Sequence, residues 1–336
     1  MKILYALQCT GNGHIARAQE LLPILEKYAE VDLLASGHQS QILLPKIPRY
    51  NFRGISLLYN RKGGLSYWKT AFRNNFPLAL KNIYQLPLDE YDLILNDFEP
   101  ISAWACKWKG IQCIGIGHQA AMLFPETPKP KKKSLPGELV LRFYAPTTEK
   151  TGFHFQRYNK HIQLPVIRSK IRNLNPTDSG HYVVYLPSYS DEFLKEKLRK
   201  IPVLWQVFSK YAKGPRIYGN VEIFPIDEKN FLQKFESCTG ILCNAGFETP
   251  AEALFLNKKL FVIPIKNQYE QECNAVALQQ MGIAVSTRFD LEKIIVWINS
   301  KKRIKMEFPD NMEEIILHKI FKNVNDNDRQ PVTVLT

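Results

Sequence analysis

The sequence predicts an α/β protein made of two Rossmann-like domains. Residues 1–35 read as a strand, a glycine-rich loop, a helix and a second strand, which is a βαβ unit and implies a parallel sheet. The same alternation of strands and helices restarts at His181. A chain of 336 residues is large for one hydrophobic core and suits two domains. We therefore expect an N-terminal domain over residues 1–165, a C-terminal domain over residues 166–322 and a mobile tail over residues 323–336.

Apolar runs and helical spacing of apolar residues predict the individual elements. The predicted strands cover residues 2–7, 31–35, 91–96, 111–116, 181–186, 203–208, 221–224, 240–243, 260–263 and 283–285. The predicted helices cover residues 15–28, 101–108, 228–235, 268–281, 291–299 and 312–321.

Composition and charge narrow the class of protein. Apolar residues make up 45% of the chain and charged residues 23%, which is ordinary for a globular protein. The formal net charge of +13 favours an anionic partner, such as nucleic acid, anionic lipid or a nucleotide phosphate. Because the sequence carries no nucleic-acid-binding motif, we expect no nucleic-acid partner. The six cysteines form no C-x-x-C pair and are typical of reduced thiols in a cytosolic protein.

Two segments raise the question of membrane contact. No apolar run approaches the roughly 20 residues that span a bilayer, and Met1–Leu7 is too short for a signal peptide. We therefore expect a cytoplasmic protein, with the inner face of the membrane as a further location. The basic and aromatic segment Arg61–Arg73 suits an acceptor-binding or membrane-touching role, or an ordinary amphipathic helix. The loop Phe124–Pro136 carries four lysines, which suit an anionic lipid surface or a solvated loop equally.

The glycine-rich loop after the first strand points to a substrate rather than a dinucleotide. Gly11 and Gly13 fit the start of a dinucleotide fingerprint, but the second strand ends in Ser36-Gly37, where an acidic residue should grip a ribose. The loop lies at the carboxyl edge of the predicted sheet, where ligands bind in open α/β sheets. His14 at the helix start is therefore a candidate site residue, or a histidine that only packs on the helix.

Further ionisable residues follow other predicted strands. Asp97, Glu99 and His118 come after strand ends, so they should share one rim with His14. Each of them could instead cap a helix, and Asp97, just before the helix at 101, is the clearest case.

The stretch from Gly240 to Ala275 carries the strongest signal. A short strand leads into the turn Asn244–Gly246, and Thr249 and Glu252 suit the N-cap and third position of a capping box. Unpaired N–H groups and the dipole of a helix N-terminus attract an anion, so the turn is predicted to hold a phosphate. The alternative is an ordinary capped strand–turn–helix unit in which Glu252 is only a cap.

A set of residues in this stretch matches a family signature in order and spacing. The set is Gly246, Thr249, Glu252, Pro264, Glu270-Gln271 and Asn274-Ala275. It resembles the donor-binding signature of GT-B glycosyltransferases, as found in the peptidoglycan N-acetylglucosaminyltransferase and the UDP-glucuronosyl/UDP-glucosyltransferase group. The resemblance is specific over residues 240–275, weaker over residues 8–17, and covers both domains in outline. It implies two Rossmann-like domains facing each other across a cleft, with C-terminal helices crossing back to the first domain.

The resemblance also implies roles for individual residues. Glu252 would accept hydrogen bonds from the donor ribose, and Glu270 and Gln271 would read the sugar hydroxyls. The turn before the helix would hold the diphosphate, although Asn244 stands where the plant enzymes have a histidine. The further donor-binding candidates are Ser188, Ile226, Gly246, Phe247, Thr249 and Asn274. On the acceptor side the candidates are the loop glycines Gly11 and Gly13, with His118.

Together these expectations describe a hexosyltransferase. The donor would be a nucleoside-diphosphate sugar, of which a UDP-sugar fits the resemblance best, and the acceptor a carbohydrate or lipid-linked hydroxyl. His14, oriented by Asp97, is the candidate base for an inverting attack, and the turn would stabilise the departing diphosphate. We expect neither a metal nor a cofactor. The alternatives are a nucleotide-sugar 2-epimerase of the same fold and a non-catalytic polyanion-binding protein.

Overall fold

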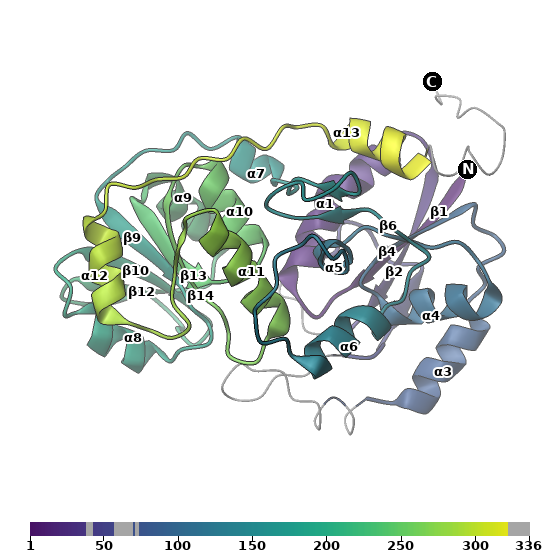
Figure 1. Cartoon of the computed structure of the whole chain (residues 1–336), viewed down its shortest axis with the longest axis horizontal. Helices are drawn as coiled ribbons and strands as arrows, with labels where there is room; N and C mark the ends of the chain where they lie inside the picture. The colour runs from purple at the N-terminus through teal and green to yellow at the C-terminus, as the bar shows by residue number, and fades with distance from the viewer. Residues whose placement is uncertain (38–42, 57–69, 71–73, 322–336) are drawn as a thin grey trace.

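The computed structural model describes residues 1–37, 43–56, 70 and 74–321. Figure 1 shows two lobes side by side, each built around a sheet with helices packed on it. The prediction of a two-part α/β fold is confirmed. The segment Arg61–Arg73, apart from Thr70, and the tail 323–336 lie outside the described residues.

The N-terminal lobe holds a parallel sheet with the strand order β3-β2-β1-β4-β5-β6 among the described residues. Its strands are β1 (Lys2–Gln8), β2 (Glu30–Ser36), β3 (Tyr50–Phe52), β4 (Leu93–Asp97), β5 (Ile114–Gly115) and β6 (Glu149–Lys150). Its helices are α1 (Asn12–Leu25), α3 (Phe76–Gln85), α4 (Pro100–Lys109), α5 (His118–Met122) and α6 (Leu135–Phe143). The apolar run Ile3–Leu7 in β1 is fully buried, as expected for a central parallel strand covered on both faces.

The C-terminal lobe holds a second sheet with the order β11-β12-β10-β9-β13-β14-β15. Its strands are β9 (His181–Tyr185), β10 (Leu204–Ser209), β11 (Arg216–Tyr218), β12 (Val221–Pro225), β13 (Gly240–Asn244), β14 (Lys259–Ile263) and β15 (Ala284–Val285). Its helices are α8 (Asp191–Leu198), α9 (Glu228–Ser237), α10 (Glu248–Phe255), α11 (Tyr269–Gln280) and α12 (Leu291–Asn299). The described pairings are parallel except for β11 with β12. A small parallel pair, β7 (Gly152–Phe153) and β8 (Ile162–Gln163), and the short helix α7 (Ser169–Arg172) connect the two lobes.

The end of the described chain returns to the first lobe, as predicted. Helix α13 (Met312–Ile315) and the π-helical turn η1 (Ile316–Phe321) lie beside α1 in Figure 1. The Tyr28 hydroxyl donates to Glu313 over 2.6 Å, and the rings of Tyr28 and Phe321 meet edge to face at 6.0 Å. This return fixes the C-terminal segment across both lobes.

One predicted strand is shorter in the structure, and some short strands of the structure were not predicted. The predicted strand 111–116 is reduced to Ile114–Gly115, because Gly110 in the left-handed region ends α4 and Ile111 N–H closes back on the carbonyl of Cys106. Strands β3 and β11, three residues each, lie at sheet edges and were not predicted.

Candidate active site

The carboxyl ends of the two sheets meet through one buried arginine. Arg17, in the second turn of α1, is 5% exposed. Its Nη1 donates to both carboxylate oxygens of Asp97, over 2.9 and 2.6 Å, and its Nη2 donates to Glu248 over 2.9 Å. Asp97 ends β4 of the first lobe and Glu248 begins α10 of the second. The sequence-predicted rims of the two domains therefore face each other in the structure.

The glycine-rich loop is shaped for this approach. A Cβ placed on Gly13 would lie 2.6 Å from the Glu248 carboxylate, so any other residue there would displace the end of the Glu248 side chain. Gly11, the N-cap of α1, has no such neighbour, since a Cβ there would meet nothing within 4 Å.

His14 and Asp97 form the predicted pair. His14 Nδ1 lies 2.8 Å from Asp97 Oδ1. The strands β1 and β4 are parallel neighbours, with Leu7 opposite Asp97. The residues that follow β1, among them His14, therefore lie at the same edge of the sheet as the end of β4. Burial acts to raise the pKa of Asp97, but Arg17 and His14 outweigh it and lower that pKa to about 2. Burial acts to lower the pKa of His14, but the charge and hydrogen bond of Asp97 raise it above the ordinary 6.5.

Asp97 is free for this role because a different residue caps the next helix. Glu99, fully buried, accepts hydrogen bonds from the N–H groups of Ile101 and Ser102 over 2.8 and 2.6 Å. The alternative that Asp97 caps α4 is therefore wrong, and Glu99 is committed to the cap.

An aromatic residue in a strained conformation separates these two carboxylates. Phe98 has φ 59°, a region that costs a non-glycine residue about 1–2 kcal/mol. Its ring lies 6.4 Å from that of His14, nearly parallel, and 4.8 Å from that of Tyr144. The reversal at Phe98 lets Asp97 face His14 while Glu99 faces the helix.

A second set of contacts joins acceptor-side and donor-side candidates. His118 Nε2 lies 2.7 Å from Asn274 Oδ1, and Gln119 Nε2 donates to Glu270 over 3.1 Å. The His118 ring also stacks on Phe247, with centroids 3.9 Å apart and planes 10° apart. Both His118 and Gln119 belong to α5 of the first lobe, whereas their partners belong to the second. The structure thus places Asn274, Glu270 and Phe247 at the interface between the lobes.

The residues predicted to face the donor phosphates lie together. The side chains of Ser188 and Asn244 exchange hydrogen bonds over 3.1–3.2 Å, and Asn244 also donates to the carbonyl of Ile263 over 2.8 Å. The space beside Gly246 is open, because a Cβ there would meet no atom within 4 Å. A backbone turn with open space and a following helix N-terminus is suited to an anion.

The predicted capping box at α10 is wrong. The helix begins at Glu248, with Phe247 as N-cap and no side-chain cap, so Thr249 lies inside the first turn. The helix starts early because Phe247 takes helical backbone angles while its ring packs on His118. The carboxylate of Glu252 consequently has another partner.

Glu252 is held by Arg168, from the segment that joins the two sheets. Arg168 Nε donates to Oε1 over 2.6 Å and Nη2 to Oε2 over 3.0 Å. Glu252 is 2% exposed, and burial raises its pKa despite the opposing effect of Arg168. The contact is a bidentate, buried ion pair, which leaves each carboxylate oxygen a second lone pair.

The remaining donor candidates differ in environment. Gln271 is buried and accepts from the N–H of Ile265 over 3.0 Å, so its side chain supports the loop after β14. Ile226 follows β12 and is exposed. Within the described part of the chain, no group of three or more histidine, cysteine, aspartate or glutamate side chains is arranged to hold a metal ion.

Three charged residues of this site were not predicted from the sequence. Arg17 lies one helical turn after His14, a spacing that puts both side chains on the same face of α1. Glu248 and Glu252 have the same relation on α10. This spacing could have shown that Arg17 lies beside His14 and that Glu248 lies beside Glu252. Nothing in the sequence links Arg168 to Glu252.

Comparisons with known proteins agree with this geometry. The model of the family described as Glycosyl transferase family 1 matches residues 1–299. The comparison with curated proteins finds no match. Among solved structures, MurG from Acinetobacter baumannii is 12% identical, with 96% of this chain and 99% of that chain covered at a TM-score of 0.56.

Two other similar structures were solved with nucleotides. The glycosyltransferase SsfS6 from Streptomyces sp. SF2575, complexed with thymidine diphosphate, is 14% identical, with 90% and 92% covered at a TM-score of 0.57. UGT89C1 from Arabidopsis thaliana, complexed with UDP-L-rhamnose, is 15% identical, with 97% and 95% covered at a TM-score of 0.56. These likenesses confirm the predicted GT-B arrangement of two Rossmann-like domains.

Proposed function

Because the chain belongs to glycosyl transferase family 1 and is a glycosyltransferase, we propose that it moves a hexosyl group from a UDP-sugar to a hydroxyl of a carbohydrate or lipid-linked acceptor. The reaction inverts the anomeric carbon and needs no metal. The observation that carries this proposal is that Arg17 links Asp97, the partner of His14 in one lobe, to Glu248, which follows the open turn at Gly246 in the other. The nucleotides bound to SsfS6 and UGT89C1 support a nucleotide-sugar donor.

In this mechanism His14 takes the acceptor proton. Asp97 stays ionised, so Nδ1 carries a hydrogen and Nε2 offers its lone pair. As the acceptor oxygen bonds to the anomeric carbon, its proton passes to Nε2 and the bond from that carbon to the diphosphate breaks. Asp97 stabilises the imidazolium that forms. The negative charge on the departing diphosphate lies at the N–H groups and positive dipole end of α10.

The donor is held along the second lobe. Ser188 and Asn244 face the phosphates, and the backbone after β12, at Ile226, faces the base. Arg168 fixes the plane of the Glu252 carboxylate, whose remaining lone pairs accept from the ribose hydroxyls. Glu270, beside Gln119 of the other lobe, reads the sugar.

The pair Glu270 and Gln271 gives a prediction that separates sugar reading from loop support. Glu270→Ala should weaken binding of the nucleotide sugar about tenfold while leaving the bare nucleoside diphosphate unchanged, because its carboxylate would touch hydroxyls that the nucleotide lacks. Gln271→Ala should weaken both ligands equally, since its amide oxygen holds Ile265 N–H. Calorimetric titration of both variants with both ligands checks this. Equal losses in Glu270→Ala would show that Glu270 supports the loop as well.

The first lobe offers a surface for a lipid-linked acceptor. No helix among the described residues is long and apolar enough to cross a membrane. Exposed apolar side chains follow each other four residues apart on α6, at Leu135, Leu139 and Phe143, just after the exposed lysines 131–133. A second stripe on α3 is Phe76, Leu80 and Tyr84. Trp104 of α4 donates to the carbonyl of Phe143, so α4 joins α6, and α3 packs on α4. Figure 1 shows these helices at the lower right.

We expect this surface to bind anionic membrane. Leu139→Glu should lower the bound fraction several-fold in sedimentation with vesicles containing phosphatidylserine, because it removes apolar area and adds repulsion. Val296→Glu, at an exposed apolar position on α12 of the other lobe, is the matched control. Equal binding of Leu139→Glu and wild type would remove the membrane from the proposal.

The proposed reaction is tested with a panel of nucleotide sugars. Release of nucleoside diphosphate should depend on an added hydroxyl acceptor, and radiolabel should appear in the acceptor. Conversion of a nucleotide N-acetylhexosamine to its 2-epimer without an acceptor would instead identify an epimerase. No turnover of any donor, with polyanion binding retained, would favour a non-catalytic protein.

A further inference from the structure

Two glutamates one turn apart on α10 are both paired with arginines, but differently. Glu252 is buried and held by two nitrogens of Arg168. Glu248 is the first residue of the helix, its side chain is 31% exposed, and Arg17 Nη2 reaches only its Oε1. The side chain of Glu248 can therefore turn toward solvent, whereas that of Glu252 is fixed.

The Glu248 carboxylate lies close to the proposed diphosphate site, so its negative charge would repel the diphosphate. The turn at Gly246 and the positive end of α10 favour an anion, and the Glu248 carboxylate is already an anion at that end. With neutral His14, the cluster of Arg17, Asp97 and Glu248 carries one positive and two negative charges. A diphosphate that binds beside this cluster is repelled by its net negative charge, unless the Glu248 side chain moves away.

Arg17 is built to exchange one partner and keep the other. Its Nη1 is fixed to both oxygens of Asp97, which is fully buried. Only Nη2 faces Glu248 across the interface. Replacing the glutamate oxygen by a phosphate oxygen at Nη2 therefore disturbs neither Asp97 nor its contact with His14.

We propose that Glu248 is an internal substitute for the donor diphosphate on Arg17, and that donor binding exchanges the carboxylate for a phosphate oxygen. This inference rests on the proposed function and assigns Arg17 as a contact to the leaving group. When the bond to the anomeric carbon breaks, the charge that develops on the diphosphate lies against the guanidinium. Glu248 sets the affinity for diphosphates, because it competes with them for Nη2.

The test compares a nucleoside diphosphate with its nucleoside. The probe is whichever of UDP, TDP, GDP or ADP binds wild type most tightly, and calorimetry gives its dissociation constant. Glu248→Gln should bind the diphosphate about tenfold more tightly, because a competing charge is removed, and the nucleoside unchanged. Arg17→Lys should bind the diphosphate about tenfold more weakly, because an ammonium cannot bridge two anions as a guanidinium does, again without changing the nucleoside. Glu192→Gln, an exposed charge on α8, is the matched control and should change neither ligand.

The outcomes separate this inference from the proposed function. A purely structural role for Glu248 would change diphosphate and nucleoside together. Unchanged or weaker diphosphate binding in Glu248→Gln, with normal binding by wild type, would overturn the inference and leave the donor site standing. Absence of binding of every nucleoside diphosphate to wild type would overturn the proposed function, and this inference with it.

Discussion

His14→Ala should lower the rate of glycosyl transfer by about two to four orders of magnitude, the usual contribution of a positioned base. The donor affinity should survive, because His14 is not among the donor contacts proposed above. Turnover and donor binding are measured separately on the same preparation. Full transfer activity in His14→Ala would show that the base is another group; Glu99 is committed to the cap of α4, and both ring nitrogens of buried His118 face oxygen acceptors.

Asp97→Asn is the companion variant, and its pH profile is diagnostic. The neutral form of His14 is the active base, so the rate rises with pH through the pKa of His14. Asp97 raises that pKa, so the asparagine should move the acidic limb of kcat/KM to lower pH and lower the maximal rate less than His14→Ala does. An unmoved limb would mean that the titrating group is not His14.

Glu252→Gln should destabilise the protein by about 2–3 kcal/mol. Removing one partner of a buried ion pair costs about 3–5 kcal/mol, and here the cost is smaller because Arg168 Nη1 also reaches Glu228 over 3.2 Å. Denaturant unfolding measures this change. The same variant should lose donor affinity by about 1–3 kcal/mol, the range for a charged hydrogen bond.

The control for Glu252→Gln separates its two effects. Arg168→Gln breaks the same ion pair and should destabilise the fold similarly, but it retains the carboxylate proposed to bind ribose. Donor affinity should therefore fall less in Arg168→Gln than in Glu252→Gln. Full stability in Glu252→Gln would contradict the buried ion pair, and full donor affinity would contradict the ribose contact.

The sequence predicted those parts of the fold that depend on local pattern. Apolar runs located the central strands, and the rule that parallel strands end on one edge brought His14 to Asp97. The start of α10 was misplaced at Thr249, because the local capping pattern was outweighed by the packing of Phe247 on His118. Local propensity is a weak guide where a tertiary contact fixes the backbone.

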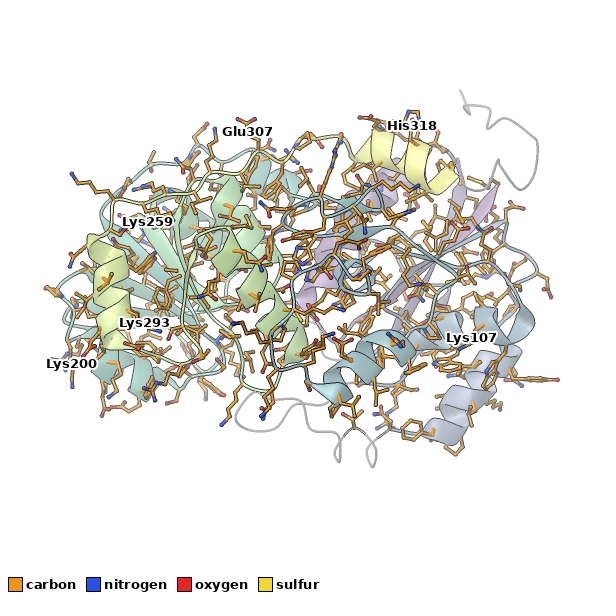
Figure 2. The ribbon with its side chains drawn as sticks, viewed as in Figure 1. Lys107, Lys200, Lys259, Lys293, Glu307 and His318 are labelled. Carbon is orange, nitrogen blue, oxygen red and sulfur yellow. The ribbon has the colours of Figure 1, made fainter. Side chains whose placement is uncertain are left out.

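The charged partners could not be predicted because they come from distant segments. Arg168 is 84 residues from Glu252, and Arg17 is 231 residues from Glu248. A helix face shows which side chains lie together on one element but not which residue of the other lobe they meet. Figure 2 shows side chains throughout both lobes, including the region where the lobes meet. Which of these side chains pair with each other is decided only when the chain has folded.

In the proposed function, the open turn at Gly246 and the groups around it hold a nucleoside diphosphate. The most direct measurement is a thermal-shift comparison of the wild-type protein with nucleoside diphosphates, their sugars and the corresponding nucleosides. A ligand that binds the folded state raises the melting temperature with its concentration. We predict stabilisation by a nucleoside diphosphate, and more by the matching nucleotide sugar, with little effect of the nucleoside. No shift with any nucleotide or nucleotide sugar, at concentrations up to the millimolar range, would contradict the account.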